Sequence, residues 1–447
     1  MPITSLRLTL ADQLASAGTS PEDKERQTFL PPVTGRVVNQ AGRRALIRQM
    51  VLQAPCHFFY KDNKENMSTM EELTDMRELN GCTMASTKES RWKEATQRYI
   101  ANMLLRNLGL RTALLNGTYR ESPTIRFTIN ERGHIRDINA PACVDRVIQK
   151  SVSRNVLIPA IRPHLIYDNY ASLKDRGTHF ARRRFMMMLR SYIRANGIDG
   201  YVLIGDISKY FDSVDHEVLK QQIDPLLKDQ PADVIALIYQ IIDSSSESGK
   251  GLNLGGEPPQ ILAVGYLGPI DTFVKVVKGV KYFGRYMDDF FVIGRSKEEL
   301  KNLLAEISEK VAELRLNINF KKTHIVKLRH VFVWLQTKYV ITATGGIKTI
   351  PTRGKLLRER RRLKAFRRLV DKGQMTTYEA WMAYKSWRGS VMTDYNSCSR
   401  ALRRMDAVFW QLFPVITHPK PENRYTVAAD IWKDLEREDL KTYCLTA

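Results

Sequence analysis

The chain has 447 residues and carries 70 Lys and Arg against 48 Asp and Glu, a formal net charge of +22 at pH 7. A chain of this length can bury a large core and is expected to form two or three domains. The charge favours a polyanionic partner, and because the cations cluster, we expect nucleic acid rather than a membrane surface. The five cysteines form no Cys-x-x-Cys pair, which argues against a zinc site or disulfide framework and favours a reducing, cytoplasmic setting.

The N-terminal residues show no secretory signal. Arg7 and Asp12 interrupt the first stretch of the chain, and no uninterrupted apolar run approaches the length of a bilayer span. We therefore expect no membrane partner. Residues 1–90 are expected to form a mostly helical extension that contacts a partner or packs on the domain after it.

The first regular pattern beyond this extension is a hairpin. Residues 127–138 predict two strands joined by the turn Glu131-Arg132-Gly133. Arg136 and Arg132 lie on this hairpin, where a planar guanidinium could bind phosphate oxygens in bidentate fashion. Either arginine could equally be a solvated hairpin charge.

Two later segments place acids at strand ends. Residues 201–205 form a short apolar run typical of a buried strand, and Asp206 follows it directly. Residues 281–294 predict a second hairpin whose tip is Tyr286-Met287-Asp288-Asp289. Adjacent carboxylates repel each other, so keeping both ionised favours a bound cation, and Mg²⁺ prefers such oxygen ligands. An isolated Asp-Asp turn is usually solvated, so the metal prediction depends on Asp206 coming close.

The C-terminal third is mainly helical in pattern. Ser296 to Glu299 is a capping-box pattern that begins a helix with leucines at core spacing. Shorter segments follow at residues 317–323 and 331–336. Residues 353–368 are the densest basic patch, and residues 377–386 and 397–413 also have helical patterns. The basic run is either a solvated helix face or a surface for phosphates.

These blocks, taken in order over roughly residues 90–413, resemble those of reverse transcriptases. The resemblance implies an α/β (α+β) fold: a right-hand polymerase with a ferredoxin-like antiparallel palm, α/β fingers and a helical thumb. The expected divisions are an extension at 1–90, fingers at 91–200, palm at 201–350, thumb at 351–413 and tail at 414–447. A compact prokaryotic or phage enzyme is implied, because nothing after the thumb resembles an RNase H or integrase domain.

The resemblance also assigns roles to individual residues. Asp206, Asp288 and Asp289 would be the catalytic acids and, with Ile207, the ligands of two Mg²⁺ ions, or of Mn²⁺ in their place. Lys322 matches a lysine that can protonate the leaving pyrophosphate, although a plain surface lysine also explains it. The residues expected to bind the incoming dNTP are Arg132, Arg136, Tyr210, Phe211, Gly255 and Gln260. The residues expected to bind nucleic acid are Trp334, Arg358, Arg361, Arg362 and Arg368.

Some of these positions have alternatives or depart from the family pattern. Phe211 is the expected steric gate beneath the sugar, Tyr210 is its competitor, and both could instead fill the core. Pro259-Gln260 stands where many bacterial relatives have Ser-Gln or Ser-Pro. Gln336 replaces the glycine of the primer grip, so the turn there is expected to differ.

The implied activity is RNA-directed DNA synthesis. The implied partners are template RNA, a primer or cDNA duplex and dNTPs, with a noncoding RNA or an accessory protein as a further candidate. An antiphage defence system is the favoured setting, and a diversity-generating retroelement is the alternative. Two other classes stay open: another palm polymerase, such as an RNA-dependent RNA polymerase, and a non-catalytic nucleic-acid-binding protein on the same scaffold.

Overall fold

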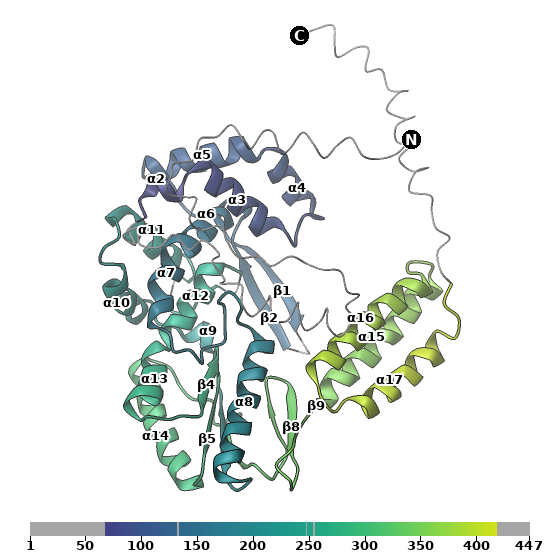
Figure 1. The fold of residues 1–447 in the computed structure, drawn as a ribbon. Helices are drawn as coiled ribbons and strands as arrows, with labels where there is room; N and C mark the ends of the chain where they lie inside the picture. The colour runs from purple at the N-terminus through teal and green to yellow at the C-terminus, as the bar shows by residue number, and fades with distance from the viewer. Residues whose placement is uncertain (1–67, 132–133, 247, 254, 418–447) are drawn as a thin grey trace, which may run out of the picture. The chain divides into compact units, whose positions relative to one another are not determined.

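The computed structural model describes residues 68–131, 134–246, 248–253 and 255–417 (Figure 1). All of them belong to one unit, Lys64–Ala447. Most of the expected N-terminal extension and of the tail, and the turn residue Arg132, lie outside the described residues. The side chains of residues 130–137 lie outside them too, so Arg136 is placed by its backbone alone.

Helices and one hairpin make up the N-terminal half of the described chain. The first helices are α2 (Met70–Leu73), α3 (Met76–Thr87), α4 (Glu94–Ala101) and α5 (Met103–Leu115). The predicted hairpin follows as the antiparallel pair β1 (Ile125–Glu131) and β2 (His134–Ala140). After it come α6 (Cys143–Val152), the π-helix η2 (Ser153–Leu157), α7 (Ile158–Ile161), the 3-10 helix η3 (Arg162–His164) and α8 (Thr178–Asn196).

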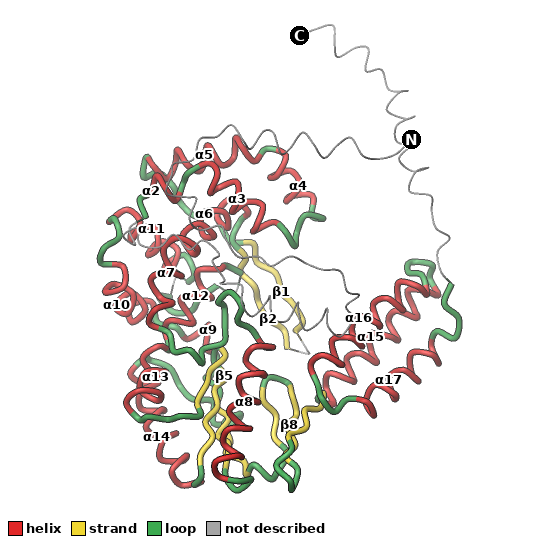
Figure 2. Tube along the Cα trace, viewed as in Figure 1, coloured by secondary structure: helices red, strands yellow, loops and turns green. Residues whose placement is uncertain are grey.

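A four-stranded antiparallel sheet forms the centre of the described chain (Figure 2). Its strands are β3 (Tyr201–Gly205), β4 (Phe283–Tyr286), β5 (Asp289–Gly294) and β6 (His324–Lys327), in the spatial order β4-β5-β3-β6. The helices after β3 are α9 (Tyr210–Ser213), α10 (His216–Leu227), α11 (Ala232–Asp243), α12 (Glu257–Tyr266), α13 (Gly268–Thr272) and the π-helix η4 (Phe273–Val277). Helix α14 (Lys297–Glu313) lies between β5 and β6. This β-α-β-β-α-β order is the ferredoxin-like arrangement, which confirms the predicted fold class.

Side chains from successive residues of β3 enter different cores. Val202 and Ile204 join the cluster that contains Phe185 of α8, whereas Leu203 joins the larger cluster formed with the helices between β3 and β4. Because neighbouring residues of a strand point to opposite faces, the sheet is covered on both sides. This explains why residues 201–205 read as a continuous apolar run rather than an alternating one.

A second sheet and three helices complete the described chain. The sheet consists of β7 (Phe332–Trp334), β8 (Thr337–Ile341) and β9 (Ile347–Pro351). The helices are α15 (Arg353–Asp371), α16 (Thr377–Asp394) and α17 (Ser399–Leu412). They share a core that includes Leu363, Tyr384 and Phe409, so the basic residues of α15 are carried on a packed helix.

One helical run has the length and composition of a membrane span. This run, Glu257–Val277, comprises α12, α13 and η4, and half of its most apolar window is buried inside the protein. The sequence analysis found no uninterrupted apolar run here because Asp271 and Lys275 lie within it. Burial of this kind is typical of the core helix of a folded domain, and the run is weak evidence for a membrane segment.

Candidate active site

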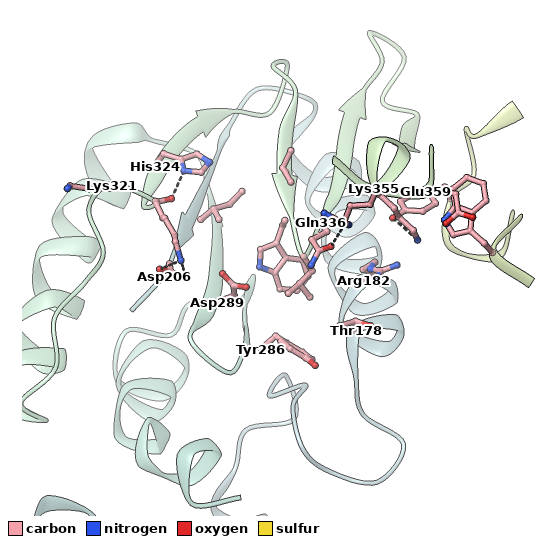
Figure 3. A pocket seen from close by; sticks show the side chains of 18 of the residues that line it. Thr178, Arg182, Asp206, Tyr286, Asp289, Lys321, His324, Gln336, Lys355 and Glu359 are labelled. Carbon is pink, nitrogen blue, oxygen red and sulfur yellow. Dashed lines mark hydrogen bonds and ion pairs between the residues drawn. The ribbon is translucent and has the colours of Figure 1, made fainter. Parts of the chain in front are cut away.

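Asp206 and Asp289 lie opposite each other at the end of the central sheet. Strand β3 pairs with β5 up to Gly205 and Phe290. Continuing this register by one residue sets Asp206 opposite Asp289, and cross-strand neighbours lie close enough to interact. Both carboxylates face the same cavity of about 1040 Å³, as the close view shows (Figure 3).

The residue before Asp206 must be glycine for this approach. A Cβ built on Gly205 would lie 2.1 Å from Cζ of the Phe290 ring, which no real contact allows. The ring therefore occupies the space that a side chain at 205 would need. Glycine thus lets β3 and β5 stay paired up to the position where the acids begin.

Beyond Asp206 the chain continues into a short bridge with residues 317–319. The amide of Asn319 donates to the Asp206 carbonyl at 2.8 Å, and the amide of Ser208 donates to the Asn317 carbonyl at 2.9 Å. Ile207 is therefore the non-hydrogen-bonded partner of Ile318, and its own peptide groups point away from that strand. The Ile207 carbonyl as a metal ligand therefore stays a prediction.

The turn that carries Asp288 has a strained backbone. Met287 has φ 54°, a left-handed conformation that costs a residue with a Cβ about 1–2 kcal/mol. Arg285 holds this turn from beneath, because its Nη1 donates to the Met287 carbonyl at 2.9 Å. The strained residue therefore directly precedes Asp288 and Asp289, the two adjacent acids predicted to be catalytic.

Arg285 is itself held by a buried ion pair that sequence reasoning missed. Its Nε and Nη2 donate to the Asp271 carboxylate at 2.7 and 2.6 Å, and Nη2 also donates to the Val264 carbonyl at 3.0 Å. Both side chains are fully buried. An arginine inside an otherwise apolar hairpin strand was the available signal, although its partner on α13 could not be identified from spacing.

The pKa of Asp289 reflects its burial and the two neighbouring acids. Burial, and then repulsion from Asp288 and Asp206, raises the pKa of Asp289 to about 7. Asp206 is 6% exposed. Its carboxylate accepts a hydrogen bond from the side-chain amide of Asn319 at 2.9 Å and pairs with Lys322 Nζ at 3.0 Å. Among the described residues, no three His, Cys, Asp or Glu side chains stand together as a ready-made metal site. Carboxylate oxygens that repel one another suit a divalent cation, so these residues agree with a Mg²⁺ or Mn²⁺ site. The site itself stays a prediction.

Lys322 forms an ion pair with one of the three acids, Asp206. The ion pair with Asp206 raises the pKa of the Lys322 ammonium, and Asp288 and Asp289 add to the effect. Its side chain is otherwise well exposed to the cavity. Lys322 is therefore within reach of a bound phosphate, whereas its role as a general acid stays a prediction.

The two aromatic residues after Asp206 are placed differently. Tyr210 is buried, and its hydroxyl donates to the Ala263 carbonyl. Phe211 is half-buried and packs against the edge of the core. Of the two, Phe211 is the one still able to contact a ligand, which favours it over Tyr210 as the predicted gate.

The remaining residues predicted to bind dNTP are only partly described. Gly255 lies against the end of β2, where an added Cβ would be 2.7 Å from the Cα of Ala140. Gln260 is exposed on α12. Arg136 lies in β2 opposite Ile129, and its side chain is outside the description, as is the whole of Arg132. Their roles stay predictions.

The expected primer-grip turn keeps a left-handed backbone without glycine. Trp334 pairs with Thr337 around a two-residue turn in which Leu335 and Gln336 have φ 43° and 58°. Positive φ at both central residues is typical of a type I′ hairpin turn. The exposed bond from Arg358 Nη2 to the Gln336 side chain, at 3.3 Å, joins this turn to α15.

Trp334 itself is placed in the core. Its ring is 2% exposed and lies 4.8 Å from both Phe185 and Phe291, centre to centre. This burial gives Trp334 a structural role beneath the turn. Trp334 also lines the cavity that holds the acids, and its contact with nucleic acid stays a prediction. The sequence did not show which residue of this strand is buried. In the structure the neighbour Val333 is the exposed one.

The wall of the cavity opposite Asp206 is formed largely by α15 (Figure 3). Arg358 and Arg362 line it, together with Lys355 and Glu359. Arg361 and Arg368 are exposed on the same helix and are not among the cavity residues. Two of the four predicted thumb arginines therefore face the cavity that holds the acids.

Comparison with known proteins gives a family for this region. Residues 128–346 match the model of the family described as reverse transcriptase (RNA-dependent DNA polymerase). Protein YkfC of Escherichia coli (strain K12) is 24% identical over 271 residues, which cover 51% of this chain and 69% of that protein. The match confirms the resemblance to reverse transcriptases.

Similar solved structures include two yeast telomerases. Apo telomerase from Candida tropicalis, truncated from its C-terminal domain, is 14% identical with a TM-score of 0.42, over 55% of this chain and 60% of that one. Telomerase from Candida albicans in complex with a fragment of telomeric RNA is 12% identical with a TM-score of 0.41, over 70% of this chain and 64% of that one. The chain therefore spans less than two thirds of either telomerase.

Proposed function

We propose that this chain, whose residues 128–346 form a reverse transcriptase domain, copies an RNA template into DNA by two-metal nucleotidyl transfer. The observation that carries the proposal is the opposition of Asp206 and Asp289 across paired strands at a cavity with basic walls. Two Mg²⁺ ions on Asp206, Asp288, Asp289 and the Ile207 carbonyl would stabilise the charge on the attacking and leaving oxygens. The same residues suit Mn²⁺.

The protein groups around these acids would position the substrates. Arg358 and Arg362 on the opposite wall can bind the phosphates of a primer and template without reading sequence. Lys322 can bind the triphosphate and supply a proton to the departing pyrophosphate. Phe211, half-buried and five residues after Asp206, would exclude a 2′-hydroxyl and so favour dNTPs.

Primer extension tests the catalytic proposal. Purified protein is given an RNA template annealed to a DNA primer, with dNTPs and Mg²⁺. Asp288→Asn and Asp206→Asn are expected to lose extension while they keep RNA binding. Asp212→Asn is the matched control, because this substitution removes the same charge from an exposed residue of α9. Equal extension by Asp288→Asn and by wild type would refute the proposal.

Two rival functions give different results in the same assay. An RNA-dependent RNA polymerase would prefer NTPs in the wild type, whereas the proposed gate predicts dNTP preference that Phe211→Ala relaxes. A binding protein on this scaffold would bind RNA and extend no primer with either nucleotide set. Because Phe211 is only half-buried, the comparison of dNTP and NTP incorporation by wild type and Phe211→Ala is the experiment that separates the two polymerase classes.

The biological setting is proposed as antiphage defence in the cytoplasm, with a diversity-generating retroelement as the alternative. The close succession of the expected fingers, palm and thumb segments supports a small dedicated enzyme. Sequencing the nucleic acid that copurifies with the protein separates the settings. A single noncoding RNA and its cDNA would support a dedicated template, and random host RNA would count against one.

A further inference from the structure

Helix α8 presents an arginine stripe on the face turned away from the central sheet. Its buried residues pack beside β3 and β5, and they are Ala181, Phe185, Met188, Leu189 and Tyr192. Arg183, Met187, Arg190 and Arg194 are exposed. At 3.6 residues per turn these four positions fall within about 60° of one another, along about 16 Å of helix. The helix contains five arginines and neither Asp nor Glu.

Aromatic rings continue this stripe at the N-terminal end of α8. The Arg176 guanidinium carbon lies 4.8 Å from the centre of the Tyr167 ring and 4.5 Å from that of Phe180. The Arg183 guanidinium lies 5.5 Å from the centre of Phe180. Tyr167 is 61% exposed. Flat rings and guanidinium planes held in this way are surfaces on which unpaired bases stack.

The surroundings of the stripe leave its positive charge unbalanced. A cavity of about 900 Å³ beside α8 is lined by five basic residues, Arg176, His179, Arg182, Arg183 and Arg190, and by two acids, Asp175 and Asp394. Asp394 is already bound, at 3.0 Å by Arg182 and at 3.2 Å by Lys355. A further cavity, of about 610 Å³ at the C-terminal end of the helix, is lined by three basic residues, Arg295, Lys327 and Arg329, and by one acid, Asp199, which pairs with Arg329 at 2.9 Å.

We propose that this region binds single-stranded RNA outside the polymerase cavity. The α8 surface is defined as Tyr167, Arg176, Phe180, Arg183, Arg190 and Arg194. Its charge calls for a polyanion, and its exposed ring with stacked guanidiniums favours unpaired bases over an acidic protein or an anionic membrane. The surface leads toward the catalytic acids, because Thr178, Arg182 and Tyr286 line both the cavity beside α8 and the one that holds Asp206.

RNA on the α8 surface would be the part of the template that is not yet, or no longer, paired with the primer. This identification as template rests on the proposed function, whereas RNA binding by the surface does not. Binding and extension are therefore measured separately. Loss of extension in Asp288→Asn with full RNA binding would leave the α8 surface untouched.

The test removes three exposed charges together. The variant Arg183→Gln/Arg190→Gln/Arg194→Gln is compared with Lys297→Gln/Lys301→Gln/Lys310→Gln on α14, which loses the same charge from a helix rich in acids. Anisotropy of a labelled single-stranded RNA is followed from 50 to 200 mM salt. Each phosphate contact of a single strand contributes about 0.7 to the salt slope, so the α8 variant is expected to lose about 2. Over that salt range, wild-type affinity then falls about 20-fold more than that of the α8 variant.

Two further measurements separate stacking on the α8 surface from charge alone, and RNA binding from catalysis. Arg→Lys at the same three positions is expected to restore the salt slope but not the full affinity, because the planar guanidinium of Arg183 over the Phe180 ring is lost. Extension on a template only a few nucleotides longer than the primer duplex is expected to be unchanged, while KM for a long template rises. Tm is measured for every variant to confirm folding.

Three results would overturn the proposal. One is equal RNA affinity and salt slope in the α8 variant and the α14 control. Another is loss of short-template extension together with RNA binding in a folded α8 variant, which would make the surface part of the polymerase cavity. The third is unchanged RNA binding with lost binding to vesicles of anionic lipid, which would assign the surface to a membrane.

Discussion

Removing Asp271 should separate the stability of the protein from the position of the turn at Met287, which carries the predicted catalytic acids. Asp271→Ala leaves Arg285 fully buried with no carboxylate partner. An uncompensated buried charge of this kind costs about 3–5 kcal/mol of unfolding free energy. The double variant Asp271→Leu/Arg285→Met replaces both charges by apolar groups of similar size, and such replacements are often neutral or stabilising. We therefore expect the double variant to recover most of the stability lost in Asp271→Ala.

Activity should not recover with stability. The double variant lacks the bond from Arg285 to the Met287 carbonyl, which holds the left-handed turn between the strands. A displacement of the acids by about 1 Å can cost on the order of 100-fold in rate, so kcat for primer extension should fall about 10- to 100-fold. Urea unfolding measures the free energies, and single-nucleotide extension measures kcat. Full recovery of kcat in the double variant, or a cost below about 1 kcal/mol for Asp271→Ala, would refute the reasoning.

Three further substitutions test single contacts. Gly205→Ala should destabilise the protein by about 1–3 kcal/mol in urea unfolding, because the new Cβ would overlap the Phe290 ring; an unchanged midpoint would contradict this. Gln336→Gly should raise stability by about 0.5–1 kcal/mol, since glycine adopts positive φ without strain and the bond to Arg358 is exposed; a destabilised variant would show that the contacts of the Gln336 side chain matter more. Asp289 should make stability pH-dependent in EDTA: its pKa is raised from 3.8 to about 7, so the folded state binds more protons, and stability falls as pH rises through this range. Mg²⁺ should reduce that fall and Asp289→Asn should remove it, and a Tm independent of pH in wild type would contradict the assignment.

Local patterns were enough to predict the elements that carry the acids. The continuous apolar run before Asp206 and the aromatic, β-branched flanks of Asp288-Asp289 are properties of short segments, and the structure has strands at both. The convergence of Asp206 on Asp289 was expected from the resemblance, whereas their register depends on Gly205 and Phe290, which only the folded sheet reveals.

Long-range pairings were what the sequence could not supply. Arg285 lies 14 residues from Asp271, and the Asp394 carboxylate joins α16 to Arg182 of α8 and Lys355 of α15. Such pairings produce no periodic pattern in the sequence, because each partner is a single residue on a different helix or strand. Trp334 is a further case: the family position suggested contact with nucleic acid, whereas its packing against Phe185 and Phe291, which buries the ring, could not be predicted from the sequence.

The distribution of charge around the cavity argues for chemistry rather than for binding alone. Its lining includes Arg358 and Arg362, which attract phosphates, and Arg182 and Lys355, which are paired with Asp394, yet it also includes Asp206 and Asp289. Carboxylates in that position repel the same phosphates and are costly to bury, as the raised pKa of Asp289 shows. A protein that only held nucleic acid would gain affinity by losing them. Their presence is explained if a cation links them to the substrate, which is the arrangement that phosphoryl transfer requires.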